Sequence, residues 1–308
     1  MRGYKDKWAN SNFYNNSLKN RGRINVWLDR SIFSNWYYSS KHLPGGKIVY
    51  SEAVIEMILI LSYVYHLPLR QTEGFMESML ELHQQTLSVP DYTTLSRRRK
   101  TIDVSKKLGK WNRRENLVFA IDASGLKCCG EKEWMRKKHK ATRQRKFVKT
   151  HTGIDVSSRH IIFNKKTSSR VHDGTVLPEA IEEVGKDIAA LLADGGYDFK
   201  DSYKLTSYDT KVIIPPRANA KVDSKTLQRN NAIQYVQDKG KAKWKREVDY
   251  HQRSIVENTF SRWKTILGEH VKAKIPEAQQ VEVTLKSIIL NKMTDLGMPK
   301  FNRIYLLS

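Results

Sequence analysis

Apolar residues recur at helical spacing over residues 50–87 and include the longest apolar run of the chain, "AVIEMILILSYVYHL" at residues 53–67. Positions three and four residues apart share one helix face, so this pattern predicts helices packed around a core. Pro68 and Pro90 mark starts or breaks of these helices. The apolar run is too short to span a bilayer and carries Glu56, so it predicts a buried core helix.

Beyond Glu115 the pattern changes to short β-branched and aromatic runs bounded by turn residues, which are typical of strands. The first run, "NLVFAIDASG", predicts a buried strand that ends at an acid. Two further runs, on either side of "DVSSRH", predict a hairpin with a polar turn. The remaining segments predict a helix at 173–185, a strand at 188–198 that ends at Asp194, a strand at 211–217, a polar basic connection at 217–247 and a helix at 249–270.

Three regions follow from these patterns. Strands in a row followed by alternating helix and strand indicate an α/β domain, which we place at residues 113–308. The helical region before it forms a small domain at residues 47–112. Residues 1–46 are polar, basic and aromatic and end in a "PGG" turn, so we expect them to form a basic N-terminal arm.

Positive charge dominates the chain, which has 55 Lys and Arg against 32 Asp and Glu, a net charge of +23 and an isoelectric point near 9.9. Charge of this size predicts a polyanionic partner, most often nucleic acid. In the helical region, "VPDYTTLSRRRK" places a turn and two threonine N-caps before a helix that displays Arg97, Arg98 and Arg99. This stretch predicts the second helix of a helix-turn-helix, with a solvated basic helix face as the alternative. Residues 47–112 are therefore the candidate DNA-binding domain.

Cysteine usage and the first residues bear on the cellular compartment. Cys128 and Cys129 are adjacent, and neighbouring residues rarely have the geometry for a disulfide, so we expect reduced thiols. The opening stretch "MRGYKDKWANSNFYNNS" has no apolar region of the kind that directs secretion. We therefore expect a cytoplasmic or nuclear protein with no membrane partner.

Three acids stand out by position. Asp122 follows the first predicted strand, Asp194 ends a later one, and Glu257 lies on the helix predicted at 249–270. Acids at the carboxyl ends of neighbouring strands in an α/β sheet converge at one edge. Taken alone, either aspartate is more often a turn or helix cap. With a glutamate from a packed helix they predict an oxygen-rich cluster for Mg²⁺ or Mn²⁺, and two such ions about 3.5–4 Å apart serve phosphoryl transfer.

The helix predicted over "DYHQRSIVENTFSRWKTILGEH" supports the predicted cation-binding cluster. At about 100° per residue, Tyr250 and Lys264 are each offset from Glu257 by about 20° and Arg253 by about 40°. All four side chains then share one narrow stripe. Arg253 and Glu257 are an i,i+4 pair, so a surface ion-pair ladder is the simpler interpretation. Lys264 lies two turns beyond Glu257, and cations on both sides of a metal-binding acid fit a phosphate backbone running along the helix.

These four residues are separated by two, three and six positions, and this spacing resembles the signature of DDE transposases from bacterial insertion sequences. The chain as a whole resembles the insertion-sequence-five family, in the superfamily that also includes the insertion-sequence-four type. The likeness covers roughly residues 20–295. It continues in "AIDASGLKCCGEKEW", "HTGIDVSSRHII", "VHDGTVLPEAI", "LLADGGYD", "IPPRANA" and "SVPDYTTLSRRRK".

The resemblance implies a ribonuclease-H-like α/β catalytic domain with a mixed sheet at residues 113–308, preceded by a small all-α DNA-binding domain. It implies that Asp122, Asp194 and Glu257 are the catalytic triad and hold two Mg²⁺ or Mn²⁺ ions. One departure is visible, because relatives often carry a basic residue after the second aspartate and this chain has Gly195. That departure puts one local phosphate contact in question and leaves the metal site untouched.

The same resemblance implies that Tyr250, Arg253 and Lys264 contact phosphates of the transposon end. The function it implies is a DNA transposase that binds the terminal inverted repeats of an insertion sequence, cleaves strands with the help of metal and transfers them into target DNA. The expected partners are double-stranded DNA and a second copy of the chain, as a homodimer on DNA, in the bacterial cytoplasm at the nucleoid. The alternatives are a metal-dependent DNA nuclease that does not join ends and a non-catalytic DNA-binding derivative.

Overall fold

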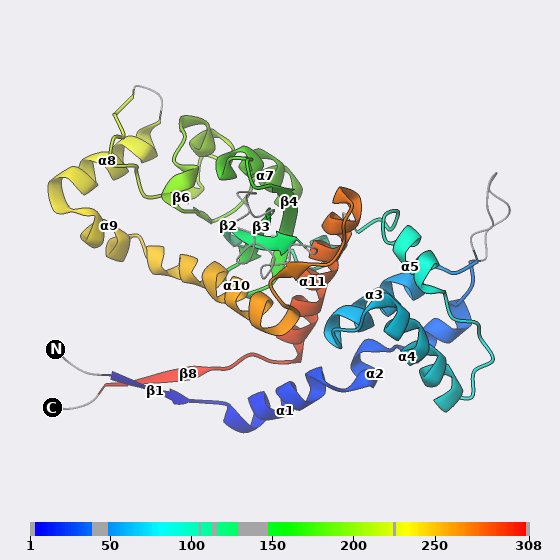
Figure 1. Ribbon diagram of the computed structural model, residues 1–308. Coiled ribbons are helices and arrows are strands. Elements are labelled where there is room, and N and C mark those ends of the chain that lie inside the picture. The colour runs from blue at the N-terminus through cyan, green and yellow to red at the C-terminus, as the bar shows by residue number, and fades with distance from the viewer. Residues whose placement is uncertain are drawn as a thin grey trace, which may run out of the picture. The chain divides into compact units, whose positions relative to one another are not determined.

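The computed structural model describes residues 4–38, 49–104, 106–112, 116–128, 147–223 and 226–305, which fall into two compact units (Figure 1). Unit 1 comprises Met1–Ile102 and Ile289–Ser308, and unit 2 comprises Asp103–Ile288.

The strands are β1 (Tyr4–Trp8), β2 (Val118–Cys128), β3 (Phe147–Asp155), β4 (Ile161–Ser168), β5 (Ala190–Leu192), β6 (Lys211–Ile213), β7 (His270–Val271) and β8 (Phe301–Tyr305). The α-helices are α1 (Ser11–Arg21), α2 (Ile24–Trp27), α3 (Glu52–Val64), α4 (Leu69–Leu82), α5 (Tyr92–Arg98), α7 (Leu177–Val184), α8 (Leu227–Lys239), α9 (Lys241–Glu247), α10 (Ser254–Leu267) and α11 (Pro276–Leu296). Short 3₁₀ helices are η1 (Arg30–Asn35), η2 (Lys107–Trp111), η3 (Asp173–Val176), η4 (Gly195–Tyr197), η5 (Lys200–Lys204) and η6 (Tyr250–Arg253).

Helix α3 is the apolar helix of unit 1. Its first turn is capped by Ser51, whose Oγ accepts a hydrogen bond from the Val54 amide at 3.3 Å. Val54, Ile55, Ile58, Leu59 and Leu61 have no exposed surface, which confirms the predicted buried core helix. In the described part of the chain no single helix is long and apolar enough to cross a membrane, and the pair α3 and α4, which together have the length and composition, is bent by 110°.

The basic helix α5 begins differently from the prediction. The two threonines were expected to cap it, but the N-cap is Asp91, whose Oδ1 accepts hydrogen bonds from the Thr93 and Thr94 amides at 2.8 Å each. The carboxylate reaches both free amides of the first turn, and the threonines then occupy helical positions. Both threonine hydroxyls also donate to this carboxylate.

The segment expected to form an N-terminal arm contains regular structure where it is described. Strand β1 pairs antiparallel with β8, and helices α1 and α2 follow it. The indole Nε1 of Trp27 donates to the Arg21 carbonyl at 2.7 Å, and that of Trp36 donates to the Ser88 carbonyl at 2.8 Å. Both indoles are buried, so this stretch packs aromatic side chains into unit 1.

Unit 2 is built on a mixed sheet with strand order β4-β3-β2-β5-β6, and β7 pairs with the far end of β2. Strands β2, β3 and β4 are antiparallel neighbours, whereas β5 and β6 run parallel to β2. The predicted hairpin is β3 and β4, and the Ser157 and Ser158 hydroxyls both donate to the Asp155 carboxylate in its turn at 2.7 Å. The predicted mixed α/β architecture is confirmed.

A hydrophobic core lies between the sheet and helix α10. Helix α10 contacts β2 and β3, and its apolar side follows the helical period. The core comprises Ala120, Ile154, Val156, Ala190, Leu192, Ile213, Ala232, Trp244, Tyr250, Val256 and Phe260. These contacts fix α10 against the strands that carry the candidate acids.

Strand β2 is longer than the sequence suggests. Its parallel pairing with β5 stops at Ala120, but its antiparallel pairing with β3 continues from Phe119 to Lys127. Asp122 therefore lies within the strand, and the prediction that it follows the strand is wrong. Gly125 is tolerated inside the strand because only the Phe147 ring approaches the position of its missing Cβ.

The periodicity predicted one continuous α-helix over the C-terminal signature, and this prediction is wrong. Asp249 has a left-handed backbone with φ of 55°, residues Tyr250–Arg253 form η6, and α10 begins at Ser254. A 3₁₀ turn advances about 120° per residue. Tyr250 and Arg253 therefore depart from the predicted stripe, and Tyr250 is 9% exposed.

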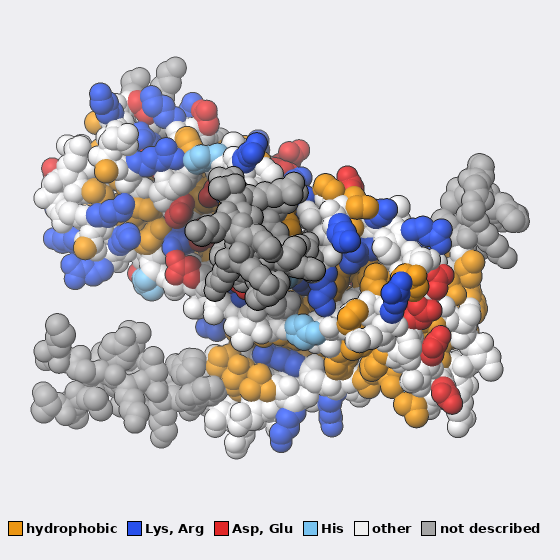
Figure 2. Space-filling model, in the orientation of Figure 1, with side chains coloured by type: hydrophobic (Ala, Val, Ile, Leu, Met, Phe, Trp, Pro, Cys, Tyr) orange, Lys and Arg blue, Asp and Glu red, His pale blue; other side chains and the backbone are white. Residues whose placement is uncertain are grey.

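The segment at 217–247, expected to be a polar connection, carries α8 and α9. Exposed basic residues lie along these helices, including Lys239, Lys241, Lys243 and Arg246, and Figure 2 shows lysine and arginine side chains gathered over them. The predicted cysteine pair is only partly described, because Cys128 ends β2 and Cys129 lies outside the described residues.

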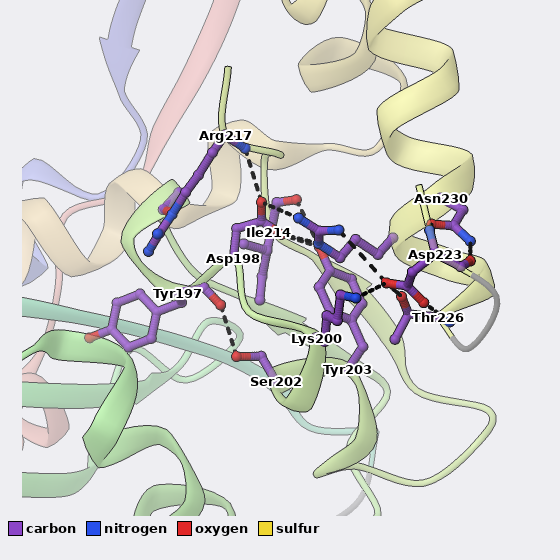
Figure 3. A network of polar contacts seen from close by, with 12 residues as sticks. Tyr197, Asp198, Lys200, Ser202, Tyr203, Ile214, Arg217, Asp223, Thr226 and Asn230 are labelled. Atoms are coloured by element: carbon purple, nitrogen blue, oxygen red, sulfur yellow. Dashed lines mark hydrogen bonds and ion pairs between the residues drawn. The ribbon is translucent and has the colours of Figure 1, made fainter. Parts of the chain in front are cut away.

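A buried ion pair ties α8 to the loop that follows β5 (Figure 3). Arg229 donates to both carboxylate oxygens of Asp198, from Nε at 2.7 Å and from Nη2 at 3.2 Å. The Arg217 amide also donates to Asp198, at 3.0 Å. The side chains of Arg229 and Asp198 are 8% and 0% exposed, and Asp223 Oδ2 lies 3.9 Å from Arg229 Nη1, so water contributes little to balancing these charges.

Replacing the cation of this pair should destabilise unit 2 strongly. Arg229→Leu leaves the Asp198 carboxylate buried without its partner, and we expect the free energy of unfolding to fall by about 3–5 kcal/mol. Urea unfolding followed by circular dichroism measures the change. Lys204→Leu is the control, because the Lys204–Asp201 pair is exposed and should contribute no more than about 1 kcal/mol. Equal losses in the two variants would contradict this account.

Candidate functional site

The sheet register brings the two predicted aspartates to the same level. Ala120 of β2 and Leu192 of β5 are the last parallel pair, and Asp122 and Asp194 each lie two residues further along. Asp194 begins the turn η4, where its Oδ1 accepts a hydrogen bond from the Gly196 amide at 2.7 Å. Parallel strands therefore present both acids at one edge of the sheet, as the sequence predicts.

Arg253 links this edge to the third predicted acid. Its Nη1 donates to Asp122 Oδ2 at 2.7 Å, and its Nη2 donates to Glu257 Oε1. The Arg253 and Asp122 side chains are 15% and 17% exposed, whereas Glu257 is 57% exposed. One guanidinium thus bridges two carboxylates from different elements. Arg253 belongs to η6, and it lies between Asp122 of β2 and Glu257 of α10.

The electrostatics of Asp122 reflect this crowding. Burial raises the pKa of Asp122, and the nearby Asp194 carboxylate raises it further. The Ala123 amide and the Arg253 guanidinium act in the opposite direction on the same pKa. An acid whose pKa is raised by burial and by a nearby carboxylate is typical of functional sites.

The three predicted acids offer only oxygen ligands. Among the described residues, no three His, Cys, Asp or Glu side chains are arranged as a metal-binding group. The Arg253 guanidinium instead provides positive charge between Asp122 and Glu257. Carboxylate oxygens suit Mg²⁺ or Mn²⁺, so the chemistry of the donor set fits such an ion.

Comparison with known proteins gives the family. A family model described as "Transposase DDE domain" matches residues 19–131, and a second with the same description matches residues 113–292, more than half of the 308 residues. The chain belongs to the DDE transposase family. A solved structure titled "Cryo-EM structure of piggyBac transposase synaptic complex with hairpin DNA (SNHP)" is similar over 96% of this chain and 78% of that chain, with 10% identity and a TM-score of 0.38. DDE transposases generally use divalent metal ions.

The predicted DNA-contacting residues of the transposase lie in different settings. Lys264 is exposed in the last turn of α10. Tyr250 packs against Trp244 with ring centres 6.1 Å apart, and the Arg253 guanidinium carbon lies 5.6 Å from the Tyr250 ring centre. Of these three residues, Tyr250 thus lies in the core, Arg253 is bound to the acids, and Lys264 is exposed.

The predicted basic helix of the transposase shows a similar division of roles. Arg97 is exposed and donates to Thr94 Oγ1 at 3.3 Å. Arg98 donates from Nη1 to the Tyr50 carbonyl at 2.9 Å, and Arg99 has a buried Nε. Arg97 is therefore the member of the run that is most available to a partner.

Sequence reasoning missed a basic residue beside the second aspartate. Arg217 donates from Nε to the Gly195 carbonyl and from Nη2 to the Gly196 carbonyl, each at 3.0 Å. Its guanidinium also lies over the Phe199 ring, 4.5 Å from the centre. Arg217 stands in the quoted "IPPRANA" segment, but no sequence pattern indicates that this loop returns to the turn after Asp194.

A polar cluster on β3 and η3 was also missed. Asp173 accepts a hydrogen bond from Lys149 Nζ at 2.9 Å, and His151 Nδ1 lies 3.9 Å from the same carboxylate oxygen. His151 Nε2 bonds to Thr167 Oγ1 at 2.8 Å, and the histidine is fully buried. Asp173 begins the helix predicted at 173–185, and no local pattern indicates its contacts with Lys149 and His151 of β3.

This cluster should make stability depend on pH. Burial lowers the pKa of His151 from 6.5 to about 4, and the Asp173 carboxylate only partly opposes the shift. The folded state disfavours protonation of His151. The stability that the neutral histidine contributes is therefore complete above pH 6.5 and is lost as the pH falls towards 4. A change of this size corresponds to about 3 kcal/mol. Urea unfolding at pH 7 and at pH 4 measures the prediction. Between these two pH values the free energy of unfolding should fall by about 3 kcal/mol less in His151→Gln than in the unmodified protein.

The exposed His251 supplies the control for this prediction, because its side chain is 74% exposed. His251→Gln should leave the pH dependence of the unfolding free energy as in the unmodified protein. If His151→Gln does the same, His151 is not the source of the acid sensitivity.

Proposed function

We propose that the chain is a DNA transposase of the insertion-sequence-five type, which cleaves DNA at transposon ends and transfers the strands into target DNA. The observation that carries the proposal is the bridge from Asp122 through Arg253 to Glu257, beside Asp194 at the same sheet edge. The strand order, with three antiparallel strands followed by two strands parallel to the first, supports a ribonuclease-H-like catalytic domain.

Asp122, Asp194 and Glu257 are the residues that would hold the divalent cations, two Mg²⁺ or Mn²⁺ ions by the family resemblance. When bound, these cations supply Lewis acidity at a phosphodiester and lower the pKa of water. The chain's own part is to fix the ligands: β2 and β5 set the two aspartates, and α10 brings Glu257 to them. Water cleaves the phosphodiester at the transposon end and frees a 3′-hydroxyl. The hydroxyl loses its proton, bonds in line to the phosphorus of the target strand and displaces the target 3′-oxygen, so one phosphodiester replaces another.

Arg253 and Lys264 contribute binding in this mechanism. A guanidinium that engages two carboxylates in the free protein also matches the paired oxygens of a phosphate. Lys264 lies in the last turn of α10, beyond Glu257 and open to solvent, where a DNA backbone can follow the helix. Tyr250 supports the Arg253 guanidinium with its ring from the core side.

The proposed partners are double-stranded DNA, as transposon ends and target, and a second copy of the chain on that DNA. The net charge of +23 supports a polyanionic partner, and the proposed setting is the bacterial cytoplasm at the nucleoid. Pairing of two DNA ends requires at least two catalytic units, which is why a homodimer on DNA is proposed.

Removing any one acid should abolish chemistry while DNA binding persists. For Asp122→Asn, Asp194→Asn and Glu257→Gln we expect strand cleavage in Mg²⁺ to fall at least about 10³-fold, because each weakens several kcal/mol of transition-state stabilisation. Cleavage of labelled DNA carrying the inverted repeats that flank the coding region measures it, and a gel shift measures binding. Asp201→Asn is the control, since that acid is 88% exposed and, among the described residues, its side chain pairs with Lys204 alone.

Three outcomes separate this proposal from its alternatives. Cleavage that survives in any of the three variants contradicts the assignment of that acid. Cleavage by the unmodified protein without joining of pre-cleaved 3′-hydroxyl ends to a plasmid indicates a nuclease. Binding with no metal-dependent cleavage indicates a non-catalytic DNA-binding derivative.

Phosphate contacts should appear in the salt dependence of binding. Each neutralised phosphate contributes about 0.9 to the slope of log K against log salt, so Lys264→Ala and Arg97→Ala should each lower the slope by about 1. Lys211→Ala is the control, because this exposed lysine begins β6, at the opposite end of the parallel strands from the acids. An unchanged slope in Arg97→Ala would mean that α5 presents only a solvated basic face.

A further inference from the structure

Arg217 is an exposed cation in the loop that follows β6, and no carboxylate of the described residues lies within ion-pair distance of its guanidinium. Its Nε and Nη2 donate to the carbonyls of Gly195 and Gly196 at 3.0 Å each. A guanidinium has five N–H donors, so three of them have no partner among the described residues. An uncompensated positive charge with free donors therefore lies beside the turn that begins at Asp194.

The backbone already ties this loop to the chain around it, so the Arg217 side chain is not its only link. The Arg217 amide donates to Asp198 at 3.0 Å, and the Tyr203 hydroxyl donates to the Ile214 carbonyl at 3.4 Å. Asp198 is buried and paired with Arg229. Figure 3 shows the Arg217 side chain leaving this network and lying apart from it. The guanidinium is therefore available for a function of its own.

An aromatic ring supports the guanidinium. The Arg217 Cζ lies 4.5 Å from the centre of the Phe199 ring, a distance at which a cation is attracted to an aromatic face. The ring is fixed in turn, because it meets the His172 ring edge-on with centres 5.1 Å apart and occupies the space that a Cβ of Gly174 would fill. Together with the two turn carbonyls, the ring holds the exposed guanidinium in one orientation.

An oriented guanidinium with a free edge matches the paired oxygens of a phosphate. Because the carbonyls that hold it belong to the two residues after Asp194, a phosphate bound there lies close to that acid. We propose that Arg217 binds a backbone phosphate of DNA next to the phosphodiester that is cleaved at the acids of the site. The inference rests on the proposed function, because it takes this phosphate from the DNA strand that is cleaved.

The test measures binding to duplex DNA that carries the inverted repeat flanking the coding region. Fluorescence anisotropy in EDTA, over a range of salt, gives the affinity without any contribution from metal. Arg217→Gln keeps a donor for the turn but removes the charge, and we expect affinity to fall about 10–100-fold and the salt slope to fall by about 1. Arg217→Lys keeps the charge but not the paired donors, so affinity should fall while the slope stays.

A second measurement locates the phosphate. Each phosphate around the cleavage point is replaced, one at a time, by a neutral methylphosphonate. In the unmodified protein, one replacement beside the cleaved phosphodiester should weaken binding about 10–100-fold. In Arg217→Gln the same replacement should have no further effect, because the partner of that phosphate is already absent.

Lys204→Ala is the matched control. Lys204 lies on η5, is 53% exposed and pairs with Asp201 at 3.1 Å. It is thus an exposed cation near Phe199 in the chain, but a carboxylate already balances its charge. Its removal should leave the salt slope and the methylphosphonate pattern as in the unmodified protein.

Each outcome has a defined meaning. A lower slope in Arg217→Gln, together with a phosphate beside the cleavage point that no longer matters, supports the inference. An unchanged slope, an unchanged methylphosphonate pattern or a phosphate remote from the cleavage point overturns it and leaves the proposed function standing. A lower thermal unfolding midpoint in both Arg217 variants with an unchanged slope assigns a structural role and also overturns it.

The proposed function fails by a different result. Unmodified protein that binds this DNA but shows no metal-dependent cleavage overturns the proposed function, whereas the contact with Arg217 is measured without metal. Unmodified protein that does not bind this DNA overturns both.

Discussion

The closeness of Asp122 and Asp194 is the constraint on which the candidate site depends. Parallel pairing of β2 with β5 fixes both acids at one edge, and neither strand can shift without breaking the pairing that buries its neighbours. Burial raises the pKa of Asp122, and the neighbouring Asp194 carboxylate raises it further. The edge therefore requires a positive charge, and the protein supplies one from Arg253.

The position of Arg253 depends in turn on a break in the helix that carries the signature. Asp249 adopts a left-handed backbone and η6 follows it, so Tyr250 packs into the core while Arg253 faces the sheet edge. Helix α10 then starts afresh, and its apolar side fixes Glu257 near the guanidinium. The Arg253 side chain therefore serves two interactions, an ion pair with acids of the chain and a proposed contact with a DNA phosphate. The first is formed in the free protein, and the second belongs to the proposed complex with DNA.

The sequence predicted those features that local patterns encode. Two short apolar runs and a polar turn specified the β3–β4 hairpin, and the continuous apolar run specified α3. The end of β2 was not predictable, because its last residues are held by pairing with β3, which is distant in sequence. The break at Asp249 was missed for a related reason: a 3₁₀ turn and an α-helix share almost the same hydrophobic period over four residues. The burial of Tyr197 and the partners of Arg217 are set by packing, and no local pattern reports them.

Gly195, the residue after Asp194, lies close to the loop that follows β6. A Cβ at Gly195 would lie 3.3 Å from the Pro215 carbonyl, and one at Gly196 would lie 2.8 Å from Asp194 Oδ1, so the tight turn favours glycine at both positions. Their two carbonyls point outward and accept the Arg217 guanidinium. A positive charge is therefore present at this turn, on a residue 22 positions further along the chain from Gly195. The turn needs no side chain at Gly195, and its last residue, Tyr197, is fully buried. The guanidinium thus binds to the backbone of the turn and is not carried by it.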